Sequence, residues 1–431
     1  MNRRLLAAAL LLLLPACAGA QATDPAAREL IERLMARIDS LERRVAELET
    51  ERGQRTPTPR PGPAGVAEAH AHDQAPAPQI TNPEAVQPTY PSLKINGFGD
   101  VDFGATNLRG ASVPFGAQTL LAPHGGFALG QTTLHLISAL SPKVSFFSEI
   151  AFTARTDAGT GTPPAPGFNP EVERLIVRYD ANDYFKVSFG RYHTPINYWN
   201  TAFHHGQWLQ TTVSRPEMTQ FGGSFIPVHF IGTLVEGAAP AGGLNLNYNF
   251  GAGNGRGQVI YRSGDAGDIN NNRAWLLNVF LKPDRLYGLQ IGGSVYRDLV
   301  NPLGVPGARE WIQSGHIVWL KETPEFIAEF ANVTHRPIAG GPAFNSQAWY
   351  VQTAYRLPWF GRVWKPYYRI EQIHVPRSDV VFRLVPTFTA STSGIRYDIS
   401  SLAAFKLEYR YYWRRDLMPI RGIFAQTSFT F

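Results

Sequence analysis

The strongest constraint on the fold is an alternation of apolar and polar residues that recurs from Leu93 to Phe431. Segments of about ten residues follow this period of two, and the turn-favouring residues Gly, Pro, Asn and Asp separate them. Alternate residues of a β-strand lie on opposite faces of its sheet, so each segment predicts a strand with one apolar face. The clearest segment has on its apolar face Ala403, Phe405, Leu407, Tyr409 and Tyr411, and on its polar face Lys406, Glu408 and Arg410.

Composition narrows the all-β architectures that these strands can build. Only 17% of the residues are charged, below the roughly 25% of soluble proteins, so an ordinary cytosolic enzyme fits poorly. Beyond the N-terminus, no uninterrupted apolar run approaches the roughly 20 residues of a membrane helix, which excludes a helical membrane protein. A large sandwich, a repeat array and a transmembrane β-barrel remain. In a barrel the apolar face points outward to lipid.

The N-terminus, residues 1–20, has the layout of a secretory signal peptide. Two arginines precede an apolar run at residues 5–14, and small residues at 18–20 provide an A-x-A cleavage site. We therefore expect the mature chain to be exported. Cys17 is the only cysteine, so cleavage after the small residues leaves a chain that forms no disulfide. The alternative is a lipoprotein-type cleavage that makes Cys17 the lipid-carrying first residue.

Residues 21–52 are expected to form a short α-helical coiled coil. Arg37 and Arg44 fall at positions that meet Glu42 and Glu49 across a parallel pair of helices, which favours self-association. The alternative is a helix that lies against its own barrel. The apolar seam has the 3-4 spacing of heptads, with β-branched residues at one core position and Leu at the other: Ile31, Leu34, Ile38, Leu41, Val45 and Leu48.

Residues 53–91 are rich in Pro, Ala and Gln and lack apolar periodicity, which predicts a disordered linker. His70 and His72, beside Asp73, offer too few preorganised ligands for a structural metal site. The expected domain order is a signal peptide at 1–20, a coiled coil at 21–52, a linker at 53–91 and a barrel at 92–431.

Both ends of the barrel region carry motifs of outer-membrane proteins. Residues 394–413, GIRYDISSLAAFKLEYRYYW, resemble the penultimate hairpin of general and phosphate-selective porins, and residues 93–104, LKINGFGDVDFG, resemble their first strand. The last strand resembles the C-terminal signal that the barrel-assembly machinery recognises, with Phe429 and Phe431 as the candidate signal residues. Its apolar face holds Ile423, Ala425, Thr427, Phe429 and Phe431.

The chain as a whole therefore resembles porins of the DcaP-like and phosphate-selective type. This resemblance implies a β-barrel in the outer membrane of a Gram-negative bacterium, with the N-terminal region in the periplasm. It also implies a homo-oligomer, commonly a trimer, although the heptad seam favours dimers. The implied partners are outer-membrane lipid, the barrel-assembly machinery and small anionic solutes, with no nucleic acid and no cofactor.

We expect about sixteen antiparallel strands, with eighteen as the alternative. Seventeen segments show the pattern, one of them beginning near Arg256, and bacterial single-chain barrels use even numbers. A barrel of this size encloses a water-filled lumen. Longer loops rich in Pro and Gly would be extracellular. Tight turns, which would be periplasmic, are expected at residues 141–142, 181–183, 283–284 and 322–324.

The barrel region from Pro91 onward carries 7 Lys and 23 Arg against 12 Asp and 11 Glu, a net charge of +7. A lipid-facing Arg or Lys costs about 2–4 kcal/mol at the midplane, so these charges belong to the lumen, rims and loops. Rings of Arg and Lys favour anions such as phosphate and carboxylates. Acidic residues on the same faces leave the alternative of a paired, nearly neutral wall. The candidate pore-lining residues are Arg174, Arg178, Arg262, Arg369, Arg396, Lys406 and Arg410.

Residues 191–227 form the longest stretch without the strand rhythm. They predict either a loop that folds into the lumen and narrows it, as the third loop does in the porins that this chain resembles, or an extracellular loop. Adjacent His204 and His205 would point apart on a strand and no Cys is near, so no metal site is expected. The candidate constriction residues are His193, Trp199, His204, His205 and Trp208.

The common nucleotide-binding, hydrolase and zincin signatures are missing, and we expect no enzymatic activity. The favoured function is passive diffusion of small hydrophilic solutes through a porin, with a preference for anions. The resemblance does not extend to specific phosphate binding, because the phosphate-selective porins use a cluster of Lys and this barrel has few. The alternative function is a structural or adhesive outer-membrane protein that its coiled coil tethers in the periplasm.

Overall fold

The computed structural model describes residues 89–108, 125–154, 167–220, 225–260, 262, 264–265 and 267–431. The expected signal peptide, Cys17, the coiled coil and nearly all of the linker lie outside the described residues. Within the described part of the chain, no helix is both long enough and apolar enough to cross a membrane.

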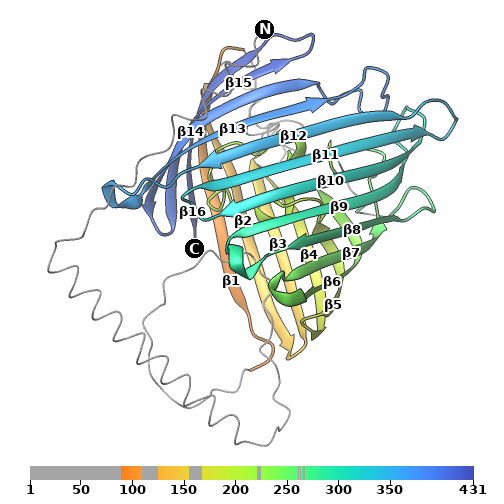
Figure 1. The fold of residues 1–431 in the computed structure, drawn as a ribbon, viewed down its shortest axis with the longest axis horizontal. Coiled ribbons are helices and arrows are strands. Elements are labelled where there is room, and N and C mark those ends of the chain that lie inside the picture. The colour runs from red at the N-terminus through yellow and green to blue at the C-terminus, as the bar shows by residue number, and fades with distance from the viewer. Residues whose placement is uncertain are drawn as a thin grey trace, which may run out of the picture. The chain divides into compact units, whose positions relative to one another are not determined.

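The described residues form one closed antiparallel barrel in which each strand pairs with its neighbours in sequence and the last strand pairs with the first (Figure 1). This confirms the expected all-β antiparallel barrel and the smaller of the two expected strand numbers. The strands are β1 Lys94–Thr106, β2 Gly125–Ser141, β3 Val144–Ala154, β4 Phe168–Asn182, β5 Phe185–His193, β6 His229–Ala239, β7 Leu246–Asn254, β8 Ala274–Leu281, β9 Leu289–Val300, β10 Ala308–Leu320, β11 Glu325–Pro337, β12 Phe344–Ala354, β13 Trp364–His374, β14 Phe388–Ser400, β15 Ala403–Arg414 and β16 Ile420–Thr430.

The barrel closes between β1 and β16. The backbone N–H of Gly97 donates to the carbonyl of Phe431 at 3.0 Å, and the N–H of Phe431 donates back to Gly97 at 3.1 Å. The rings of Phe431 and Phe429 lie over Gly97 and Gly99, at positions that a Cβ on either glycine would occupy. The two glycines of the first strand therefore leave room for the aromatic residues of the last strand.

The two faces of the strands differ as the alternation predicts. On β15, Phe405 and Leu407 are 40% and 43% exposed. The alternate residues Lys406 and Glu408 are each at most 1% exposed. Apolar side chains thus cover the outside and charged side chains lie inside, the reverse of a soluble sandwich. This is the distribution that a barrel needs in lipid.

One expected strand is not found among the described residues, which brings the seventeen candidate segments to sixteen strands. The segment that begins near Arg256 belongs to the connection between β7 and β8. The Arg256 guanidinium is buried, and it donates to Glu310 of β10 at 3.0 Å and to the carbonyl of Phe225 at 2.6 Å. Arg256 therefore holds a loop in place. The sequence around it alternates between polar and apolar residues as a strand does, which explains the wrong prediction.

The connections differ in length at the two ends of the barrel. At one end β2–β3, β4–β5, β10–β11 and β14–β15 join through two to four residues, and all four expected tight turns lie at this end. The connections at the other end include the long segment between β5 and β6. Three of the short-turn-end connections contain a single 3-10 turn: η3 Ala241–Gly243, η4 Asp284–Leu286 and η5 Phe360–Arg362.

Candidate functional site

The connection between β5 and β6, residues 194–228, folds against the inner wall of the barrel; we call it the inner loop, and it is described except for 221–224. It contains one turn of helix, α2 Trp199–Ala202, and one 3-10 turn, η2 Glu217–Thr219. Most of its described residues are buried, with Ile196, Trp199 and Thr212 fully so. Since their partners are inward-facing side chains of distant strands, the loop lies inside the barrel.

One side of the inner loop is bound by charged side chains of β13 to β15. The carboxylate of Glu408 accepts hydrogen bonds from the backbone N–H groups of Val213 and Ser214, at 3.0 and 3.2 Å, and from the Ser214 hydroxyl at 2.5 Å. Arg369 donates to the carbonyls of Ser214 and Arg215, at 2.8 and 3.1 Å. A backbone without regular secondary structure can be buried here because the wall supplies its hydrogen-bond partners.

Two further candidate pore-lining residues also bind the inner loop. Arg396 of β14 donates to the carbonyls of Trp208 and Gln210, at 2.7 and 3.0 Å. Lys406 of β15 donates to the carbonyls of Gln207 and Thr212 and, at 3.0 Å, to the side chain of Gln426. These cations face inward as their strand phase predicts, but their charged groups contact the loop.

The inward cations also pair with acidic residues of the same wall. Glu371 lies 3.2 Å from Arg369 and 2.5 Å from Arg410, and Asp398 lies 2.7 Å from Arg396. Arg410 is fully buried. Buried charges are tolerated when such partners compensate the loss of hydration. The geometry on this side matches the alternative of a paired wall.

The opposite side of the inner loop packs mainly on apolar side chains. The carboxylate of Glu329 in β11 also accepts hydrogen bonds there from the N–H groups of Tyr198 and Trp199, both at 2.7 Å. The ring of Trp199 lies 4.9 Å from that of Phe203 and 6.0 Å from that of Tyr350 of β12, both in edge-to-face contact. Sequence reasoning missed this part of the wall, because a barrel in lipid is expected to have a polar interior. The buried wall residues of this cluster from β8 to β12 are Ala274, Leu276, Tyr296, Val300, Ala308, Ile312, Val318, Ile327, Ala331, Val333, Ala348 and Tyr350.

The remaining candidate pore-lining residues lie away from the charged side of the loop. Arg174 of β4 donates to Glu149 of β3 at 2.6 Å. Arg178 lies 2.7 Å from Asp180 and 3.4 Å from Glu236. Arg262 was expected on a strand; that placement is wrong, because it lies exposed in the connection between β7 and β8.

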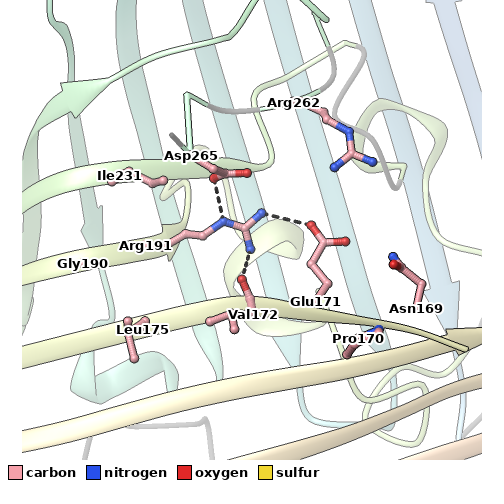
Figure 2. A pocket seen from close by; sticks show the side chains of 10 residues that line it. All are labelled: Asn169, Pro170, Glu171, Val172, Leu175, Gly190, Arg191, Ile231, Arg262 and Asp265. Atoms are coloured by element: carbon pink, nitrogen blue, oxygen red, sulfur yellow. Dashed lines mark hydrogen bonds and ion pairs between the residues drawn. The ribbon is translucent and has the colours of Figure 1, made fainter. Parts of the chain in front are cut away.

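Arg262 borders a cavity of about 630 Å³ between β4, β5 and this connection (Figure 2). The guanidinium of Arg191 crosses the cavity and donates to Asp265 at 3.0 Å, to Glu171 at 3.3 Å and to the carbonyl of Val172 at 2.5 Å. Arg191 thereby ties the β7–β8 connection to the wall beside the base of the inner loop.

Histidines gather at that base. His193, His204, His205, His229 and Glu173 each offer one nitrogen or oxygen, and these five atoms lie within 4.8 Å of one another. The expectation that His204 and His205 point apart on a strand is wrong, because both follow α2 in the loop and their ring centroids lie 4.4 Å apart. Trp208, the other aromatic candidate, lies 5.8 Å from the Arg396 guanidinium.

A second group of charges lies at the short-turn end. Glu322, in the β10–β11 turn, lies 2.9 Å from Arg356 and 3.2 Å from Lys365. Partial burial raises the pKa of Glu322, but the hydrogen bonds and charges of Arg356 and Lys365 outweigh burial and bring this pKa down from 4.5 to about 2. Lys365 also pairs with Glu325 at 2.6 Å, and Glu325 accepts a hydrogen bond from Thr211 of the inner loop.

No protein-family model and no curated protein sequence matches the chain. Solved barrels do. The anion-selective porin from Comamonas acidovorans has a TM-score of 0.56 at 11% identity, over 79% of this chain and 100% of that one. The outer-membrane channel DcaP of Acinetobacter baumannii has a TM-score of 0.54 at 12% identity, over 79% and 97%. OmpF of Salmonella typhi has a TM-score of 0.52 at 10% identity, over 79% and 97%. At these identities the likeness shows the fold: the chain has the barrel of outer-membrane porins.

Proposed function

We propose that the protein is an outer-membrane channel through which small hydrophilic solutes diffuse passively, with the inner loop as its constriction. The observation that carries the proposal is the inner loop itself, which lies inside a closed sixteen-strand barrel and binds inward residues of β11, β13, β14 and β15. A barrel with an apolar outside suits lipid. A loop held across its interior sets the size of the passage.

The selectivity that we propose is a mild preference for anions. Among the buried side chains that the structure describes, acidic residues slightly outnumber basic ones, so the barrel's net charge of +7 comes from other positions. Exposed arginines occur at the long-loop end, among them Arg336 and Arg383. Positive charge at a channel mouth raises the local concentration of anions and is screened by salt.

The proposal extends to assembly and location. A chain that is exported by residues 1–20 and inserted through its Phe429 and Phe431 strand would place residues 21–91 in the periplasm. The coiled coil at 21–52 would then join protomers below the membrane, and the barrels would associate as trimers. The exposed apolar residues of every second strand position support contact with outer-membrane lipid.

Planar-bilayer recording of the purified full chain tests this function. We expect stepwise conductance, and in a KCl gradient a reversal potential on the anion side that shrinks as salt rises. Heat-denatured protein is the control for currents caused by detergent. A folded, correctly inserted barrel that conducts no current would contradict the channel and leave the structural or adhesive role. A cation-side reversal potential would contradict only the anion preference.

A further inference from the structure

The histidine cluster at the base of the inner loop joins four separate parts of the chain. Glu173 comes from β4, His193 ends β5, His229 begins β6, and His204 and His205 come from the loop between them. His193 and His229 are direct partners in the β5–β6 ladder. A register shift in β4 opposite Glu149 and Ile150 leaves Glu173 out of the β3–β4 pairing. The cluster therefore sits where the inner loop leaves and rejoins the wall.

The imidazole rings contact one another. The His193 centroid lies 4.0 Å from that of His204, 5.6 Å from His205 and 5.5 Å from His229, and His204 lies 4.9 Å from His229. His193, His204 and His205 are each at most 5% exposed. Burying four imidazoles together is costly unless something compensates their polar nitrogens. At Nδ1 of His193, no described residue forms a hydrogen bond.

The neighbouring residues orient the two loop histidines. Nδ1 of His204 lies 3.1 Å from Oδ1 of Asn200, and Asn200 is itself fixed by donating to the carbonyls of Thr194 and Val228, both at 2.9 Å. Nδ1 of His205 lies 2.9 Å from Oε1 of Gln131 in β2. When Nδ1–H donates to an amide oxygen, Nε2 carries the lone pair. Such outer contacts commonly orient histidines that bind metals.

We propose that Glu173, His193, His204, His205 and His229 form a site for one divalent late-transition-metal ion, with Zn²⁺ as the ion used to test it. Several imidazole nitrogens with one carboxylate oxygen suit Zn²⁺, Cu²⁺ and Ni²⁺, whereas Mg²⁺ and Ca²⁺ prefer oxygen ligands. A tetrahedral Zn²⁺ site takes four of these five ligand atoms, and Zn–N bonds of about 2.0–2.1 Å place those four roughly 3.3 Å apart. The 4.8 Å limit of the cluster can contract to this spacing through side-chain rotation.

The charges around the cluster permit a cation. Glu173 contributes one negative charge, and Glu149 lies 3.3 Å from Nε2 of His193. Of the nearby arginines, Arg174 is paired with Glu149, and Arg215 donates to the carbonyls of His204 and Thr219. Arg191 lies 3.3 Å from Glu173 but also holds Glu171 and Asp265. An ion that shares Glu173 with Arg191 therefore leaves this arginine two other acidic partners.

An ion at this place would tie the beginning, the middle and the end of the inner loop to the wall. Metal binding would then stabilise the position of the loop through linkage, since the ligands come together only when the loop lies inside the barrel. Metal binding does not depend on the proposed channel function. A barrel that conducts no current would contradict the channel function alone, and a protein that binds no metal would contradict the metal site alone.

The test uses the tag-free full chain, because a polyhistidine tag binds the same ions. A His70→Ala/His72→Ala background removes the linker histidines. After treatment with EDTA, calorimetric titration with Zn²⁺ should show one site per chain, and mass spectrometry should find one Zn²⁺ after dialysis. His204→Ala/His229→Ala should weaken affinity at least about 100-fold, since each lost ligand or support costs about 10- to 100-fold. His316→Ala, a buried histidine of β10 outside the cluster, is the matched control and should leave affinity unchanged.

Absence of stoichiometric Zn²⁺ binding, or equal binding by the double variant, would overturn the proposal. Heat-modifiable migration in gels checks that the variants are folded. If the double variant does not fold, the site is tested by adding Cu²⁺ to the His70→Ala/His72→Ala protein. Its electron paramagnetic resonance spectrum should show coupling to three or more nitrogens, and a spectrum with fewer than three would contradict the site.

Discussion

The two sides of the barrel interior hold the same inner loop by different forces. On the β13–β15 side, Glu408 and Arg369 bind its backbone through hydrogen bonds from and to charged groups. On the β8–β12 side, Trp199 and its neighbours pack mainly against apolar wall residues, and Glu329 of β11 is the charged group that binds the backbone there. Apolar burial supplies free energy without direction, whereas charged hydrogen bonds specify position but must first offset desolvation. We infer that the apolar side supplies most of the docking free energy and the charged side sets where the loop lies.

The largest effect should come from breaking the apolar side. Trp199→Ala removes a fully buried side chain, and such truncations cost about 3–5 kcal/mol. We expect the loop to leave its place for much of the time, so that single-channel conductance rises and becomes noisy. Trp359→Ala, which removes a tryptophan that is 62% exposed in a turn, is the control. An unchanged conductance in a folded Trp199→Ala protein would contradict the docking role of this side.

The next effect should come from the charged side. Glu408→Ala leaves the N–H group of Ser214 and the hydroxyl of Tyr367 without their acceptor, at a cost of about 2–4 kcal/mol. The loop should shift locally on this side, so chymotrypsin should cut after Trp208 faster than in the wild type. Glu408→Gln keeps one acceptor oxygen and should be intermediate.

The matched control for Glu408 is Glu236→Ala, because Glu236 also faces an arginine but pairs only with wall residues. If chymotrypsin treats Glu408→Ala like the wild type, the charged side does not position the loop. If Glu408→Ala displaces the loop more than Trp199→Ala does, the charged side, and not the apolar side, supplies most of the docking free energy.

The difference between the two sides also explains what sequence reasoning could predict. Lipid imposes an apolar outer face on every strand, so the seventeen alternating segments included all sixteen strands, and the alternation gave the inward phase of Lys406, Glu408 and Arg410. The apolar inner wall was hidden, because residues such as Ile312 and Val333 look like further membrane-facing positions until the register is known. The opposite error occurred at Arg256, where a loop was predicted to be a strand. A polar residue that holds a loop inside the barrel cannot be told by sequence from a polar residue on the inner face of a strand.

Contacts of the inner loop depend on separations along the chain that no local pattern encodes. Arg369 binds Ser214 across 155 positions, and His205 meets Gln131 across 74. The density of His and Trp identified the segment, but its interior position required the closed barrel. The histidine cluster was missed for the same reason, because Glu173 and His229 belong to strands and only the β5–β6 pairing brings them to the loop.

A third, smaller effect concerns paired charges that do not touch the described part of the loop. Arg178→Gln leaves Asp180 without its ion-pair partner at 2.7 Å and should move the reversal potential toward cations. Arg178→Gln/Asp180→Asn removes both charges and should bring it back close to the wild type. If the double variant is shifted as far as the single one, the interior pairs do not cancel each other and the wall itself contributes to selectivity.

The smallest effect lies at the short-turn end, where Glu322, in the turn between β10 and β11, pairs with Arg356 and with Lys365 of β13. Because the pKa of Glu322 is lowered to about 2 in the folded protein from 4.5, its ion pairs stabilise the fold above pH 4.5, and this contribution is lost as the pH falls toward 2. Its side chain is 38% exposed, so solvent screening limits the effect to about 1 kcal/mol or less. Glu322→Gln should therefore lower the melting temperature slightly at pH 7 and match the wild type near pH 2. A difference that stays constant over this range would mean that lost packing, and not charge, destabilises the variant.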